Sequence, residues 1–228
     1  MIDPAARAVL RAAAAHVVVA DVDHPAIDDP TAHHLFRVLR VRDGDSVTVT
    51  DGQGRWRACR AAGGELLAEP DAEATAAVAR SATTTVAFAI PKSDRPEWIV
   101  QKLTELGVAR VVLLHAERSV VRWEPDRAAR HVAKLRRVAV EALEQSRGVW
   151  LPDVVGPVPA VDVLPGIAVA EPDGRPLTRR DDAVAVGPEG GWAPNELELA
   201  ADRVSLGATV LRVETAALVA GALLTVRD

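Results

Sequence analysis

From residue 85 onward, short and almost entirely apolar runs alternate with stretches of helical periodicity. The runs are Thr85–Ile90, Val111–Leu114, Ile167–Ala170 and Ala183–Val186, and none of them contains a charged residue. Strands buried on both faces of a sheet read as continuous apolar runs, and parallel strands need a crossover between them, usually a helix. This alternation predicts an α/β domain with a parallel sheet.

Proline and glycine positions mark the helices expected between these strands. Pro96 suits the first turn of a helix that Gly107 ends, and a long helix follows Pro125. We expect two further helices, at Pro194–Asp202 and at Glu214–Val226. The last is apolar on nearly all sides, so it either enters the core or packs against a second subunit.

The first third of the chain is typical of a small β domain. His16–Ala20 reads as a strand, and a short helix begins at Pro30. The alternating segments Ser46–Thr50 and Arg55–Arg60 flank an Asp-Gly-Gln-Gly turn, which predicts a hairpin. With a further strand at Glu65–Glu69, a small barrel or curled sheet accounts for this region. Residues 70–84 resemble a linker, so we expect domains at residues 1–71 and 72–228.

Composition excludes several classes of protein. Cys59 is the only cysteine, which excludes an intramolecular disulfide and a structural zinc cluster. The adjacent His33 and His34 cannot bind one metal from one helix face, so we expect no metal site. No apolar run approaches the roughly 18 residues of a membrane helix, and Val17–Ala20 is too short for a signal peptide. We therefore expect a cytoplasmic protein without a membrane partner.

Two strand-to-helix junctions are candidate ligand loops. The first, Gly187-Pro188-Glu189-Gly190-Gly191, lets a ligand approach the backbone closely, although a tight turn explains the same glycines. The second, Leu206–Ala216, is expected to be a short strand that runs into a helix, with Arg212 and Glu214 beside the turn. A surface ion pair between these two side chains is the alternative to a functional role.

Taken in order, these segments resemble a known family. Before the two junctions come Lys92, the segment 101–107 (Gln-Lys-Leu-Thr-Glu-Leu-Gly), Glu117-Arg118-Ser119, the segment 141–147 (Glu-Ala-Leu-Glu-Gln-Ser-Arg) and Leu151-Pro152. Together with Gly-Pro-Glu-Gly-Gly and Leu-Arg-Val-Glu-Thr-Ala, this set is similar to the bacterial 16S ribosomal RNA uridine-N3 methyltransferases of the SPOUT superfamily. Residues 34–40 (His-Leu-Phe-Arg-Val-Leu-Arg), Gly44-Asp45 and Asp51-Gly52 look like the PUA-like N-terminal domain of that family.

The resemblance implies a fold, a cofactor, a substrate and partners. The fold is a PUA-like β-barrel followed by a SPOUT α/β domain with a deep trefoil knot, in a homodimer. The reaction is methyl transfer from S-adenosylmethionine to N3 of a uridine near the 3′ end of 16S ribosomal RNA, in free RNA or in the small ribosomal subunit. The residues expected to bind the cofactor are Glu171, Pro172, Val186, Gly187, Pro188, Glu189, Gly190, Gly191, Leu206, Gly207, Val210, Leu211 and Arg212.

Arginines carry the catalytic and RNA-binding expectations. Arg212 is expected to hold a uracil carbonyl while negative charge develops on the ring, with Glu214 to orient it and Arg118 as the next candidate. Residues 110–137 hold eight basic and three acidic side chains, although the net charge of the chain is −5. The residues expected to contact RNA are Arg37, Arg40, Lys92, Arg118, Arg122 and Arg147.

Two other functions remain open. A SPOUT methyltransferase of this type could modify another RNA position, such as a ribose 2′-oxygen or a different base atom, and nucleoside analysis of the product would separate these. A non-catalytic RNA-binding assembly factor could retain the fold, and loss of cofactor binding would reveal it.

Overall fold

The computed structural model describes residues 4–69, 83–178 and 180–225. Residue contacts divide the chain into two compact units, Met1–Ser81 with Leu143–Leu151, and Ala82–Ala142 with Pro152–Asp228. The boundary expected near residue 72 lies outside the described residues. The inclusion of Leu143–Leu151 in the first unit has no counterpart in the sequence pattern.

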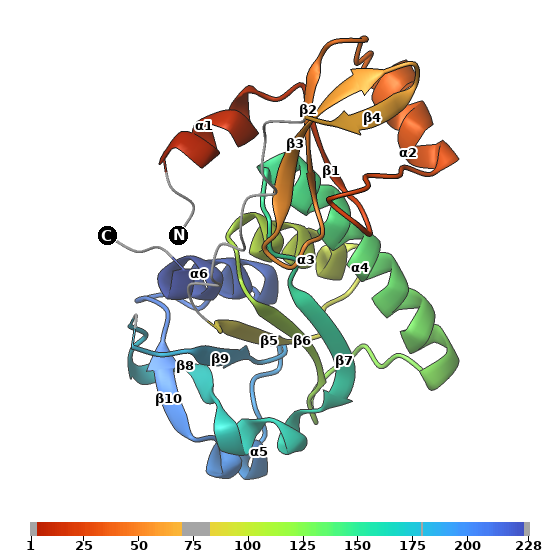
Figure 1. Ribbon diagram of the computed structural model, residues 1–228. Coiled ribbons are helices and arrows are strands. Elements are labelled where there is room, and N and C mark those ends of the chain that lie inside the picture. The colour runs from red at the N-terminus through yellow and green to blue at the C-terminus, as the bar shows by residue number, and fades with distance from the viewer. Residues whose placement is uncertain (1–3, 70–82, 179, 226–228) are drawn as a thin grey trace. The chain divides into compact units, whose positions relative to one another are not determined.

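The first unit contains a four-stranded sheet in the order β1-β2-β3-β4 (Figure 1). Strand β1 runs parallel to β2, and the other neighbouring pairs are antiparallel. The elements are α1 (Pro4–Ala12), β1 (Ala15–Val18), α2 (Asp29–His33), a π-helical turn (His34–Val38), β2 (Ser46–Thr50), β3 (Trp56–Ala62) and β4 (Glu65–Ala68).

The expected hairpin between β2 and β3 is confirmed. Its register pairs Ser46 with Arg60 and Thr50 with Trp56. In the turn, the Asp51 carboxylate accepts the backbone N–H groups of Gln53 and Arg55, which is the usual way in which aspartate stabilises a turn. Cys59 of β3 is fully buried in the core of this unit, and burial raises the pKa of its thiol to about 11. It is therefore an inert packed side chain.

The segment Leu143–Leu151 packs on this hairpin. The N–H of Gly54 donates to the carbonyl of Val149 (2.7 Å), and the N–H of Leu151 donates to that of Gly52 (2.8 Å). The carbonyl of Gly148 accepts a hydrogen bond from the ring of His16 (2.8 Å). These bonds join residues about 100 or more positions apart in the sequence. They attach the segment Leu143–Leu151 to the first unit.

The second unit is built on a six-stranded sheet in the order β10-β8-β9-β5-β6-β7. Every neighbouring pair is parallel, which confirms the α/β domain that the apolar runs predict. The elements are β5 (Thr85–Ala89), α3 (Arg95–Glu105), β6 (Arg110–His115), α4 (Pro125–Ser146), β7 (Asp153–Pro159), two 3-10 turns (Ala160–Asp162 and Leu164–Gly166), β8 (Ala168–Pro176), β9 (Ala183–Val186), α5 (Pro194–Leu199), β10 (Asp202–Ser205) and α6 (Val213–Thr225).

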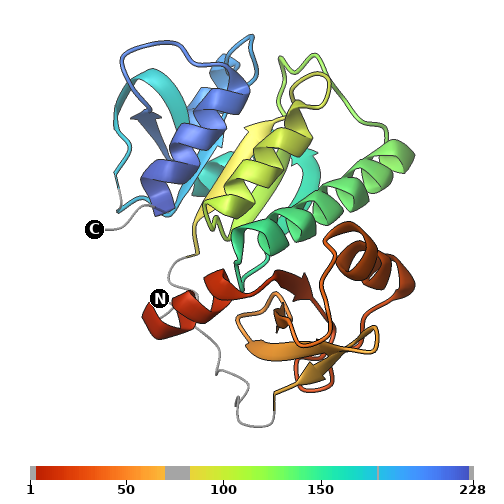
Figure 2. The ribbon, with the colours of Figure 1, turned by 90° about the horizontal axis from the view of Figure 1, so that it is seen from above.

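Helices cover both faces of this sheet. Helices α3, α4 and α6 lie side by side on one face, and α5 lies on the other (Figures 1 and 2). Helix α6 packs so closely on α3 that a Cβ added at Gly221 would lie only 2.6 Å from a methyl carbon of Leu103. The buried side of α6 includes Ala217, Ala220 and Leu224, so this helix enters the core as its apolar sequence requires.

Two sequence expectations in this unit are wrong. The helix expected at Pro194–Asp202 ends at Leu199, and Asp202–Ser205 forms strand β10 instead. The short strand expected at the start of Leu206–Ala216 is absent, and residues 206–212 form a loop that leads into α6. Gly207 has a φ of +149°, and the Val210 side chain is 88% exposed, so the loop lacks both the backbone and the burial of a central strand. Its apolar side chains line a pocket instead of packing within the sheet.

Candidate functional site

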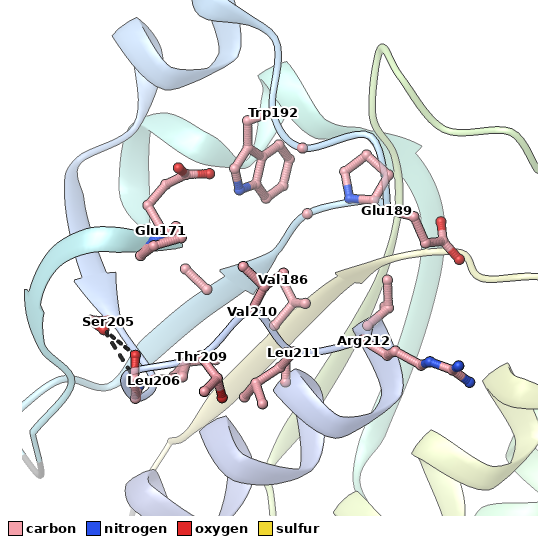
Figure 3. A pocket seen from close by; sticks show the side chains of 18 residues that line it. Glu171, Val186, Glu189, Trp192, Ser205, Leu206, Thr209, Val210, Leu211 and Arg212 are labelled. Atoms are coloured by element: carbon pink, nitrogen blue, oxygen red, sulfur yellow. Dashed lines mark hydrogen bonds between the residues drawn. The ribbon is translucent and has the colours of Figure 1, made fainter.

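A pocket opens at the carboxyl ends of β9 and β10, beside residues 170–172 of β8 (Figure 3). Strand β8 lies between β9 and β10 in the sheet, so the loops that follow β9 and β10 meet at the edge where open α/β sheets bind ligands. The cavity has a volume of about 480 Å³, which is within the range of small-molecule sites. Its walls are three short segments that come from different parts of the chain.

The first wall is an excursion in strand β8. Val169 pairs with Arg203 of β10, and the next pair is Arg175 with Val204, so residues 170–174 stand between the two pairs and leave the ladder. This excursion places Ala170, Glu171 and Pro172 on the pocket. Burial raises the pKa of the Glu171 carboxyl, the charge of Asp173 acts in the same direction, and Arg203 acts against it. An acceptor with limited access to water therefore faces the cavity.

The second wall is the loop from Gly187 to Trp192, which follows β9. Trp192 is 3% exposed, and a Cβ added at Gly187 would approach its indole nitrogen to 2.9 Å, so only glycine fits there. Gly191 has a φ of +71°, a conformation that also favours glycine. The indole N–H of Trp192 is buried without a hydrogen-bond partner in the described structure, and Figure 3 shows the ring bordering the pocket. Such a donor is suited to a ligand atom.

The third wall is the loop after β10 with the start of α6. Leu206, Val210 and Leu211 supply apolar side chains, and the Ser205 hydroxyl donates to the carbonyl of Gly207 (3.1 Å). Val213 and Ala216 of α6 complete the lining. The pocket thus combines apolar side chains with few charged ones, which is typical of sites for largely neutral ring systems.

The structure brings the expected cofactor-binding residues together, with one exception. All of them line the pocket except Gly190, where an added Cβ would lie 3.5 Å from the Cβ of Arg118. The close approach at Gly190 is thus to a side chain of another loop. The lining residues that the sequence analysis missed are Ala170, Trp192, Ser205, Thr209, Val213 and Ala216. Trp192 directly follows the Gly-Gly pair, and that adjacency was the available signal.

The expected pairing of Arg212 with Glu214 is wrong. Glu214 pairs with Arg95, the first residue of α3, at 3.1 Å between Nη1 and Oε1. The Arg212 guanidinium is exposed and has no hydrogen-bond or ion-pair partner among the described residues. Figure 3 shows it extending away from the centre of the pocket. Arg212 therefore remains available to a molecule that approaches from outside.

The other basic residues expected to contact RNA differ in their surroundings. Lys92 and Arg118 are exposed on the loops after β5 and β6, and Arg118 Nη1 donates to the carbonyl of Gly190 at 3.3 Å. Arg122 Nη2 donates to the carbonyls of Ala116 (3.1 Å) and Glu117 (3.3 Å).

In the first unit, Arg37 and Arg40 are exposed. Arg147 is half-buried and donates to the carbonyl of Ala13 at 3.1 Å, and burial lowers the pKa of its guanidinium. A structural contact thus accounts for Arg147.

The described ranges contain neither a cluster of metal ligands nor a membrane-spanning helix. Residues 4–69, 83–178 and 180–225 contain no group of three or more histidine, cysteine, aspartate or glutamate side chains that could hold a metal ion. In the same ranges no helix combines the length and apolar character that crossing a bilayer requires.

Comparison with known proteins identifies the family. A family described as an RNA methyltransferase domain matches residues 79–225, and a family described as an RNA methyltransferase PUA domain matches residues 27–60. The chain is 33% identical to the ribosomal RNA small subunit methyltransferase E of Mycobacterium tuberculosis over 218 residues, covering 85% of this chain and 83% of that protein. The protein of the same name from Synechocystis is also 33% identical, with coverage of 82% and 68%.

Solved structures agree with this assignment. A probable rRNA methyltransferase from Porphyromonas gingivalis is 27% identical with a TM-score of 0.71, over 91% of this chain and 95% of that chain. The small subunit methyltransferase E of Neisseria gonorrhoeae, crystallised with S-adenosylmethionine, shares the fold with a TM-score of 0.75 and 24% identity over the same shares of both chains. The family-level resemblance and the arrangement of a PUA-like domain before a SPOUT domain are thus confirmed. This chain belongs to the ribosomal RNA small subunit methyltransferase E family.

Proposed function

We propose that this protein transfers the methyl group of S-adenosylmethionine to N3 of a uridine near the 3′ end of 16S ribosomal RNA. The observation that carries the proposal is the pocket between residues 170–172 of β8 and the loops after β9 and β10, in a chain of this family. The N3 position and the uridine come from the family resemblance of the ordered segments and the two glycine junctions. The trefoil knot that the same resemblance implies stays a prediction.

The residues of the pocket fit S-adenosylmethionine. Val186, Leu206 and Leu211 provide apolar surface for an adenine ring, and the buried indole N–H of Trp192 and the Glu171 carboxylate provide a donor and an acceptor for polar atoms. Backbone N–H and C=O groups of the two glycine-containing loops can bind the remaining polar atoms of the cofactor. When bound, the cofactor supplies a methyl group on a positively charged sulfur, an activated electrophile that needs no metal ion.

Arginines outside the cavity suit the methyl acceptor. N3 of uracil carries a proton that must leave for a methyl group to bond there, and negative charge then spreads onto the neighbouring carbonyl oxygens. We assign Arg212 to hold one of these oxygens, because its guanidinium is exposed and unpaired among the described residues. Arg118, beside Gly190, is the second candidate. Glu214 acts on Arg95 rather than on Arg212.

Exposed cations support an RNA substrate. Lys92, Arg118 and Arg122 lie on the loops after β5 and β6, and Arg37 and Arg40 lie in the PUA-like domain. We propose that these side chains contact phosphates, in which case binding of RNA weakens steeply as salt is added. The small ribosomal subunit is the expected partner, and the cytoplasm is the expected location.

Helix α6 supports a homodimer. Its Leu223 side chain is exposed, and Leu218, Val219 and Ala222 are only half-buried in the single chain. A second copy of the chain would remove this apolar surface from water. Light scattering at micromolar concentration tests this assembly, and a monomer there would contradict it.

Nucleoside mass spectrometry tests the proposed reaction. Small ribosomal subunits and naked 16S RNA from a strain that lacks the gene are incubated with the purified protein and S-adenosylmethionine. The expected product is 3-methyluridine, formed at one site near the 3′ end. A ribose-methylated nucleoside or another methylated base would assign a different position. Cofactor binding by calorimetry without any transfer would indicate the non-catalytic assembly factor.

A further inference from the structure

Glu196, in the first turn of helix α5, is buried in the second unit. Its side chain is 1% exposed, and it is the one buried carboxylate among the described residues. Burying a carboxylate is costly unless its oxygens accept hydrogen bonds, so the partners of Glu196 show what this arrangement achieves.

The two oxygens of Glu196 accept hydrogen bonds from two different loops. Oε2 accepts the N–H of Ala193 at 2.9 Å, three residues earlier, as in the capping box that begins a helix. Oε1 accepts the N–H of Glu117 at 2.8 Å, from the loop that follows β6. Capping α5 needs only the first bond. The second bond joins segments that lie 79 residues apart in the sequence.

The second bond fixes the backbone directly before Arg118. Arg118 then contacts the pocket loop, with Nη1 donating to the carbonyl of Gly190 at 3.3 Å. A neighbouring bond strengthens the connection, since Asn195 Nδ2 donates to Glu117 Oε2 at 3.0 Å. The loop after β6 is therefore attached to the start of α5 on one side of Arg118 and to the loop after β9 through Arg118 itself.

We propose that Glu196 is a positioning residue that holds Arg118 beside the pocket. Its carboxylate sets the backbone at Glu117, and this places the Arg118 guanidinium next to Gly190, where the RNA meets the cofactor loop. The inference rests on the proposed function, because it gives Arg118 a task in binding or orienting the RNA. It also explains why glutamate is used, since glutamine offers one acceptor to two N–H donors.

Hydrogen exchange tests the contact without any activity. In Glu196→Gln, the single carbonyl oxygen is expected to stay with the nearby N–H of Ala193, so the amide of Glu117 should exchange at least about tenfold faster. Glu196→Ala removes both acceptors and gives the same result if glutamine turns the other way. Glu198→Gln, an exposed position on the same helix, is the matched control and should leave this amide unchanged. Unchanged exchange at Glu117 in both Glu196 variants would overturn the proposal.

A double-mutant cycle tests the route through Arg118. Glu196→Gln should lower kcat/KM for small ribosomal subunits by about tenfold, with the Kd of S-adenosylmethionine changed less than about threefold. In an Arg118→Ala background the same change should lower kcat/KM by less than about twofold. Equal losses in both backgrounds, or a cofactor affinity that falls as much as kcat/KM, would show a general structural role and overturn the proposal. If the wild-type protein transfers no methyl group, the proposed function fails, while the exchange experiment still decides whether Glu196 holds Glu117.

Discussion

His16 of strand β1 makes the stability of the PUA-like unit depend on pH. The ring is 4% exposed, Nδ1 lies 2.8 Å from the Thr48 hydroxyl, and Nε2 lies 2.8 Å from the carbonyl of Gly148. A carbonyl only accepts hydrogen bonds, so Nε2 carries the proton and Nδ1 accepts from Thr48. The neutral ring is thus fully bonded. A second proton would create a buried cation.

Burial lowers the pKa of His16 from 6.5 to about 4, the bond to Gly148 opposes this shift, and the charge of Arg147 adds to it. Because the folded pKa lies below the unfolded one, the neutral ring contributes stability above pH 6.5. That contribution is lost as the pH falls towards 4. Each tenfold change in proton affinity corresponds to about 1.4 kcal/mol, so the full contribution is about 3 kcal/mol.

Urea unfolding of the wild type and of His16→Gln, from about pH 7.5 to about pH 4, measures this effect. Glutamine can donate to the carbonyl of Gly148 but does not titrate, and all other titrating groups are shared, so their effects cancel in the difference. The stability advantage of the wild type should shrink by about 3 kcal/mol as the pH falls. A difference that stays constant over this range, or an NMR titration of His16 near its ordinary pKa, would refute the reasoning.

Three further substitutions test the second unit. Trp192→Phe removes the unpaired indole N–H and should weaken S-adenosylmethionine about three- to tenfold by calorimetry; unchanged affinity would mean that this donor does not meet the cofactor. Gly221→Leu should lower the free energy of unfolding by about 1–3 kcal/mol, because its side chain would overlap Leu103, and equal stability would contradict the close packing of α6 on α3. Arg212→Ala should reduce methyl transfer about 10²- to 10³-fold while melting temperature and cofactor affinity stay near wild type; full activity would leave Arg118 as the candidate.

Much of the fold follows from local sequence patterns. The apolar runs at Thr85–Ile90 and Ala183–Val186 match β5 and β9 closely, since buried parallel strands allow few polar residues. The prediction of a short strand at the start of Leu206–Ala216 was wrong, because an apolar run has the same composition whether it faces a neighbouring strand or a ligand pocket. Strand β7, at Asp153–Pro159, went unpredicted, since Gly156 and two prolines interrupt its apolar residues.

The candidate site was predictable where it depends on backbone and not where it depends on side chains from distant loops. The glycines predicted the loop after β9, because a position where another group approaches the backbone closely, or where φ is positive, usually requires glycine. The ion pair between Arg95 and Glu214 could not be predicted from the sequence, since the two residues lie far apart in the chain and each has several charged residues nearer to it. Glu196 likewise reads as an ordinary capping residue until its second oxygen is located.

The contacts at the carboxyl edge of the sheet connect loops to one another. Arg95 after β5 holds Glu214 at the start of α6, Glu196 of α5 holds the loop after β6, and Arg118 of that loop reaches Gly190 after β9. The pocket walls themselves are mostly backbone and apolar side chains. Ion pairs and hydrogen bonds of charged groups outside the cavity add connections between the loops that form these walls. Substitution of Glu196 or Arg118 should therefore weaken methylation of RNA with little change in cofactor affinity, because neither residue lines the cavity.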